Sequence, residues 1–194
     1  MSFQKKIASL SIGLATLVGC GGSSTGLPEL NYQQLDERRI ALIDDSNFAI
    51  NTPTRFLQAH PELSHGTAKF DGIMVLYLDN NRADGVIGTM SLDVNVGNGS
   101  YRGRAGQFSN FLEEPTGGRI AISNGTIEGD SINFGRADID GTVEFEIGER
   151  TIDAQAATSI RSNGSWFLAG SISGEATSKD DPTIRVRGGL ISEI

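Results

Sequence analysis

The amino-acid sequence predicts an all-β protein, an eight-stranded antiparallel up-and-down β-barrel that follows an irregular or short-helical N-terminal lead-in. From Thr67 onward, apolar residues recur at every second position in short runs, which is the pattern of half-buried strands. Turn residues separate these runs, and glycine makes up 25 of the 194 residues, nearly twice its usual share of about 7%. Eight such strands close most simply into a barrel, because closure removes the exposed edges of the sheet.

Each expected strand puts its apolar side chains on one face. The run 86–96 is the clearest example, because Met90, Leu92 and Val94 alternate with polar residues. Asn98-Gly99 then favours a two-residue type I′ turn, since both residues tolerate positive φ. In chain order, the expected strands cover 67–78, 86–96, 101–105, 120–127 with a bulge at Asn124-Gly125, 132–147 with a kink at Gly141, 152–160, 166–174 and 184–190.

The inward-facing residues predict a packed interior. They are mostly Ile, Val, Leu, Met and Phe, with Met74 and Leu92 among them. A barrel of eight strands is just wide enough to be filled by its own side chains or to hold one small ligand. A two-sheet sandwich of the same strands is the structural alternative. A transmembrane barrel would need outward apolar residues and aromatic residues at both rims, whereas this chain has one Trp and three Tyr.

The first 19 residues have the pattern of a lipoprotein signal peptide. Lys5 and Lys6 precede a mostly apolar stretch, 7–18, whose length suits a signal-peptide core of about 7–15 residues and is too short to span a bilayer. The stretch ends in Leu17-Val18-Gly19-Cys20, which resembles a bacterial lipobox. We therefore expect Cys20 to become the N-terminal residue and to carry acyl chains such as palmitate, which anchor the chain to a membrane.

Four segments are expected along the chain: a signal peptide (1–19), a lipidated flexible tether (20–31), a lead-in (32–66) and the barrel domain (67–194). Gly21 stands where an aspartate would retain such a protein at the inner membrane, so we expect the outer membrane, at its periplasmic face or at the cell surface.

The lead-in is the least regular part of the sequence. Its apolar residues, among them Leu35 and Leu42, lie between charges and fit a short helix or a strand. Thr52-Pro53 has the pattern of a helix N-terminus, with a capping residue before proline. We expect the lead-in to pack over one end of the barrel.

Composition excludes several classes of protein. With 24 acidic and 16 basic residues, the formal net charge is −8, which argues against a nucleic-acid partner because such binding needs clustered Lys and Arg. Cys20 is the only cysteine. If it carries lipid, the exported domain has no thiol for a disulfide, a nucleophile or a cysteine-ligated metal. We expect a monomer.

The chain resembles a known family in its second part. The segments Gly99-Ser100-Tyr101-Arg102-Gly103-Arg104-Ala105-Gly106, Gly170-Ser171-Ile172-Ser173-Gly174 and Gly188-Gly189-Leu190, together with the lipobox, are similar to the barrel domains of transferrin-binding protein B and related surface lipoproteins. The resemblance covers about residues 66–192 and rests mostly on turn and packing glycines. It implies a single barrel without the family's handle domain and a surface-lipoprotein habit, and it transfers no binding residue.

Candidate chemical groups are few. His60 and His65 could both face a metal or a haem, but no nearby third ligand completes a site, and ordinary loop histidines explain them as well. The acidic residues Asp138, Asp140, Glu144, Glu146 and Glu149 fit a solvated strand face better than a glycosidase or calcium site, and Asp79, Asn80, Asn81 and Asp84 lack the closing Glu of a calcium loop. No nucleophile elbow is present, so we expect no catalytic residue, no enzyme activity and no resident cofactor.

The sequence therefore predicts a lipid-anchored outer-membrane binding module. We expect it to contact a protein or a scavenged nutrient through loops near 79–85, 109–118 and 176–183, because loops on a rigid scaffold carry recognition. One alternative is a lipocalin-like carrier with a small apolar ligand or haem inside the barrel. A structural envelope lipoprotein without a ligand is the other.

Overall fold

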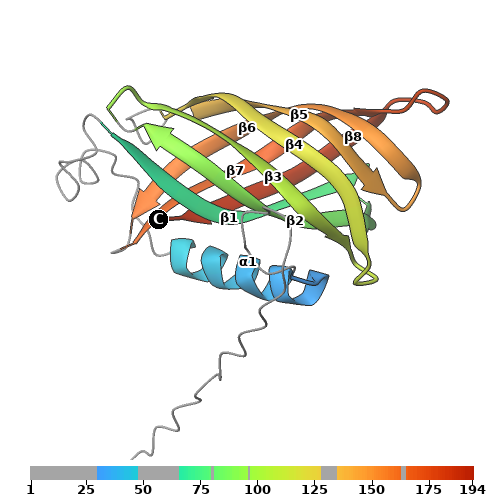
Figure 1. Cartoon of the computed structure of the whole chain (residues 1–194), viewed down its shortest axis with the longest axis horizontal. Coiled ribbons are helices and arrows are strands. Elements are labelled where there is room, and N and C mark those ends of the chain that lie inside the picture. The colour runs from blue at the N-terminus through green and yellow to red at the C-terminus, as the bar shows by residue number, and fades with distance from the viewer. Residues whose placement is uncertain (1–29, 48–65, 80, 96, 128–134, 163–164) are drawn as a thin grey trace, which may run out of the picture.

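The computed structural model describes residues 30–47, 66–79, 81–95, 97–127, 135–162 and 165–194. It confirms the expected fold class, a closed barrel of eight antiparallel strands in which neighbours in sequence are neighbours in space. In the described part of the chain before the barrel there is one helix (Figure 1). The elements are α1 (Tyr32–Asn47), β1 (Thr67–Leu78), β2 (Asn81–Asn95), β3 (Ser100–Asn110), β4 (Pro115–Thr126), β5 (Gly135–Phe145), β6 (Gly148–Ser162), β7 (Trp166–Thr177) and β8 (Ile184–Glu193).

The irregular positions in the strands agree in part with expectation. The β3–β4 register shifts where Asn124 adopts a positive φ of 51°, which is the expected bulge. Gly141, with φ 153°, lies inside a continuous β5. The expected two-residue turn at Asn98-Gly99 is wrong: β2 ends at Asn95 and β3 begins at Ser100. A type I′ turn needs positive φ at both residues, but only Gly99 of this pair has it, and the connection between the two strands is longer than two residues.

The barrel interior is filled by its own side chains. Phe70, Met74, Leu92 and Ile120 are each fully buried and belong to one apolar cluster that spans all eight strands. Interior packing of this kind follows from strand geometry, since every second side chain of each strand points inward. Met74 and Leu92, which were predicted to face inward, do so, whereas Ile147, at the end of the expected strand 132–147, is 45% exposed because β5 ends at Phe145.

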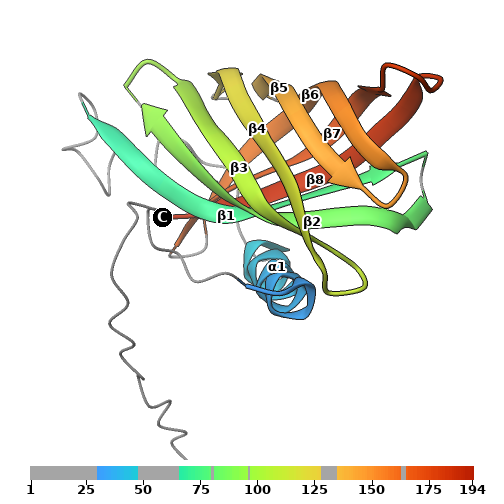
Figure 2. The same cartoon turned by 45° about the vertical axis from the view of Figure 1, so that its right-hand side comes forward.

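The lead-in contains a helix that lies along the outer wall of the barrel, not over one end as expected. Leu35 and Leu42 of α1 are buried against outward-facing side chains of four strands, β1, β2, β7 and β8. Those side chains are Ile73, Ile87, Phe167 and Ile191. The strands they come from are thus apolar on both faces, and the outer face needs a cover. Figures 1 and 2 show α1 against this side of the barrel.

The start of α1 has a capping box. Asn31 Oδ1 accepts a hydrogen bond from the Gln34 backbone N–H at 2.9 Å, and Gln34 Oε1 accepts one from the Asn31 N–H at 3.2 Å. This reciprocal pair satisfies two of the backbone donors that a helix N-terminus leaves open. The expected helix start at Thr52-Pro53 lies outside the described residues.

The up-and-down topology sorts the strand connections into two groups. We call the end that carries the β1–β2, β3–β4, β5–β6 and β7–β8 connections the hairpin end; it is on the right in Figures 1 and 2. The N-terminal part of α1, in darker blue in Figure 1, lies toward this end. Within the described residues, no helix is long and apolar enough to cross a membrane.

Candidate functional site

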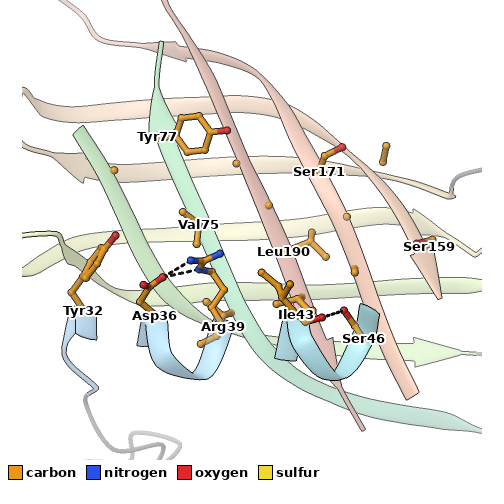
Figure 3. Close-up of a pocket in the computed structure, with 18 residues that line it drawn as sticks. Tyr32, Asp36, Arg39, Ile43, Ser46, Val75, Tyr77, Ser159, Ser171 and Leu190 are labelled. Atoms are coloured by element: carbon orange, nitrogen blue, oxygen red, sulfur yellow. Dashed lines mark hydrogen bonds and ion pairs between the residues drawn. The ribbon is translucent and has the colours of Figure 1, made fainter. Parts of the chain in front are cut away.

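A groove of about 670 Å³ runs between α1 and the outer wall of the barrel (Figure 3). One side is the helix, with Tyr32, Asp36, Arg39, Ile43 and Ser46. The other side is formed by outward-facing residues of β1, β2, β6, β7 and β8. The groove exists because a cylindrical helix cannot follow the curved wall over its whole width.

The floor of the groove is made mainly of small residues. Ala157, Ala169, Ser171 and Gly189 lie on three adjacent strands and leave the wall flat, and Val75 continues the floor onto β1. A Cβ on Gly189 would be 3.4 Å from its nearest contact, the Gly170 carbonyl oxygen, so there is room above this floor. The surface is therefore shallow, mostly apolar and open to solvent.

The charged groups of the groove belong to the helix. Arg39 Nη2 lies 2.6 Å from Asp36 Oδ1, and Arg39 Nε donates to the same oxygen at 2.8 Å. The Ser46 hydroxyl donates to the Ile43 carbonyl oxygen at 2.9 Å. Figure 3 shows both interactions within α1, on the helix side of the groove. These groups pair with each other, and none forms the nucleophile-and-base geometry that covalent catalysis requires.

The hairpin end is the second candidate surface. The structure brings the predicted loops near 79–85, 109–118 and 176–183 together at this end. Much of their length is strand, so the connections themselves are short, at 79–80, 111–114 and 178–183. Among the described residues, the large hydrophobic side chains most exposed at this end are Phe111 at 40%, Leu112 at 54% and Ile147 at 45%.

The β3–β4 connection that carries Phe111 and Leu112 is held in one shape by Asn110. The Asn110 side-chain oxygen accepts hydrogen bonds from the backbone N–H groups of Leu112 and Glu114, both at 3.0 Å. The Asn110 backbone N–H donates to the Glu114 carbonyl oxygen, and the Glu113 N–H donates to that of Asn110, also at 3.0 Å. The backbone donors near the tip are thus satisfied internally, while two apolar side chains point into solvent.

Exposed carboxylates are frequent at the same end of the barrel as these apolar side chains. All eight members of the group are exposed, whereas Lys179 and Arg185 are the exposed cations within the described part of the same connections and strand ends. The carboxylates are Asp79, Glu113, Glu114, Glu144, Glu146, Glu149, Asp180 and Asp181.

Arg150 closes the barrel interior beneath the β7–β8 connection. It takes an inward position of β6 opposite Val143, and its side chain is 3% exposed. Nη2 lies 2.9 Å from Asp181 Oδ2, and Nη1 donates to the Pro182 carbonyl oxygen at 3.4 Å. Arg150 Nε is buried without a partner among the described residues. The arginine therefore fastens this connection over the mouth of the barrel.

The other predicted residues do not form a chemical site in the described structure. Cys20, His60, His65 and Asn80 lie outside the described residues. Asp138 accepts a hydrogen bond from Asn124 Nδ2 at 2.7 Å across two strands. In the described residues, no group of three or more His, Cys, Asp or Glu side chains could hold a metal ion.

Two features of the candidate surfaces escaped the sequence analysis, namely the groove and the contribution of Ile147 to the hairpin end. The groove depends on how α1 docks, but apolar residues such as Ile73 and Val75 on the outward face of β1 are a signal that something covers that face.

No protein-family model matches the chain, and searches of curated proteins and of solved structures found no match either.

Proposed function

We propose that this protein is a lipid-anchored binding module of the outer membrane, of the transferrin-binding protein-like type, which contacts a partner protein through its hairpin end. The observation that carries the proposal is the exposure of Phe111 and Leu112 on a hairpin tip that Asn110 holds rigid. Adjacent exposed aromatic and aliphatic side chains on a fixed loop are typical of contact surfaces.

The filled interior favours external contact over an internal ligand. Phe70, Met74 and Leu92 occupy the space that a lipocalin-like carrier would leave for its cargo. The exterior surfaces, by contrast, are open to solvent. Function in this proposal is binding without catalysis.

The proposed anchor leaves the barrel room to meet a partner. Ten positions separate Cys20 from Leu30, where the described structure begins. A fully extended chain covers at most about 3.5 Å per residue, so the barrel could stand roughly 35 Å from the membrane to which the lipid holds it. A partner within that distance meets the barrel at a high effective concentration.

The test has two independent parts, both on the full chain in its native cells. First, the mass of the mature N-terminal peptide should include acyl chains on Cys20, and Cys20→Ala should release the protein from the membrane fraction. Second, the photo-crosslinking residue p-benzoyl-L-phenylalanine should give a protein adduct when it replaces Leu112. Placed at Gln155, an exposed residue of the β6 wall, it should give none. No adduct from position 112, or equal adducts from both positions, would overturn the contact surface.

A further inference from the structure

We infer that the partner of the hairpin end presents a basic surface with an apolar pocket, into which the Phe111 and Leu112 side chains insert. This inference rests on the proposed contact through the hairpin end and adds the chemistry of what is bound. Its basis is the combination of two exposed apolar side chains with the surrounding charges, not the charges alone.

The negative charge is a local property of this end. Eight exposed carboxylates lie at the hairpin end, where the exposed cations described are Lys179 and Arg185, and one of the eight, Asp181, is paired with Arg150. Toward the opposite end, exposed Lys69, Arg102 and Arg136 accompany the exposed carboxylate of Asp93. Among the described residues, exposed negative charge is therefore concentrated at the hairpin end, and charges arranged in this way steer a partner of opposite sign toward that end.

The geometry of the tip suits insertion into a pocket. Leu112 is the most exposed large hydrophobic residue among those described, and its neighbour Phe111 is 40% exposed. Asn110 fixes the backbone on both sides of them, so little conformational freedom is lost when the tip is buried. An apolar centre within a charged rim is the ordinary arrangement of a protein–protein interface.

The same charges argue against a lipid bilayer as the occupant. Glu113 and Glu114 directly follow the apolar pair and are exposed. Inserting Phe111 and Leu112 into an anionic membrane would bring these carboxylates to a surface that repels them. A basic protein surface would also remove Phe111 and Leu112 from water, and its positive charge would attract Glu113 and Glu114.

The experiment measures the adduct from position 112 in chains that differ by one charge reversal. Glu146→Lys changes the rim at the β5–β6 connection, and Asp93→Lys makes the same change in net charge toward the opposite end. We expect Glu146→Lys to lower the adduct yield about threefold or more, and Asp93→Lys to leave it within about twofold. The crosslinked segment, sequenced by mass spectrometry, should contain apolar residues flanked by Lys and Arg. Circular dichroism on both variants checks that they fold.

Each outcome decides the question. A protein adduct that responds equally to both reversals, or a crosslinked segment without basic residues, would overturn the basic partner while leaving the proposed contact in place. An adduct with the mass of a phospholipid would assign the tip to the membrane instead. If position 112 gave no adduct at all, the proposed contact itself would fail, and the inference with it.

Discussion

The Tyr101 hydroxyl on β3 lies 2.8 Å from the Thr158 hydroxyl on β6, across the interior of the barrel and 57 residues away in the sequence. Both residues are buried, so this hydrogen bond joins two strands that are not neighbours in the sheet. Burial raises the pKa of Tyr101 to about 12, and the hydrogen bond with Thr158 lowers it by a smaller amount.

That pKa predicts a loss of stability at alkaline pH. Below pH 10, Tyr101 is protonated in both the folded and the unfolded chain, and its contribution is complete. Between pH 10 and 12 the unfolded chain releases the proton while the folded chain keeps it, so the free energy of unfolding should fall by about 2–3 kcal/mol. Denaturant unfolding at a series of pH values measures this change.

Tyr101→Phe is the control for the pH effect. It leaves the Thr158 hydroxyl without its partner and should cost about 1–3 kcal/mol at neutral pH. Above pH 10 this variant should lose less stability than the wild type. An equal loss in both chains would show that other groups cause the alkaline effect.

Substitution by alanine should change the stability at one of two adjacent glycines, Gly188, and not at the other, Gly189. A Cβ on Gly188 would lie 2.0 Å from the Val75 carbonyl oxygen, whereas one on Gly189 would be 3.4 Å from its nearest neighbour. Gly188→Ala should therefore destabilise the fold by about 1–3 kcal/mol, because β8 must move away from β1. Gly189→Ala should leave the melting temperature nearly unchanged. Equal effects of the two substitutions would mean that the β1–β8 contact is looser than described.

The interior should respond as a packed core. Leu92→Ala removes a fully buried side chain and should cost about 2–5 kcal/mol, measured by denaturant unfolding. Met74→Lys should prevent folding, because the charge would be buried among apolar side chains. If the Met74→Lys chain folded, this result would contradict the filled interior and would favour the lipocalin-like carrier.

The helix offers a matched pair of substitutions. Leu42 lies on the face of α1 that packs on the barrel and is 3% exposed, whereas Ile40 on the same helix is 46% exposed. Leu42→Ala should cost about 2–3 kcal/mol and increase amide hydrogen exchange across α1. Ile40→Ala should change the free energy of unfolding by less than about 0.5 kcal/mol. If Leu42→Ala behaved like Ile40→Ala, the packing of α1 on the wall would contribute little to stability.

Strand alternation made most of the barrel predictable. Residues such as Met74 and Leu92 repeat with a period of two, and the order of the strands follows once every connection is short. The grouping of three predicted loops at one end follows from the same topology. The closed barrel itself was the simplest arrangement of eight paired strands.

The packing of the lead-in was not predictable in the same way. Leu35 and Leu42 are the only two fully buried apolar side chains described in this helix of 16 residues, too few for a clear helical period of apolar residues. The capping pair Asn31 and Gln34 was a local signal for the start of the helix that the analysis of the sequence missed. Docking on the wall depends on Ile73 and Ile191, which are far apart in the sequence, so the groove followed from the structure alone.

The pairing of β1 with β8 also bears on the order in which the barrel forms. Strand β8 follows the other seven strands in the sequence and pairs with β1, so the barrel cannot close until β8 has been synthesised. Until then β1 has an unpaired edge, and the contacts that complete the sheet span more than a hundred residues. Closure therefore joins the first and the last strand of the sheet, and β1 keeps its unpaired edge until β8 docks on it.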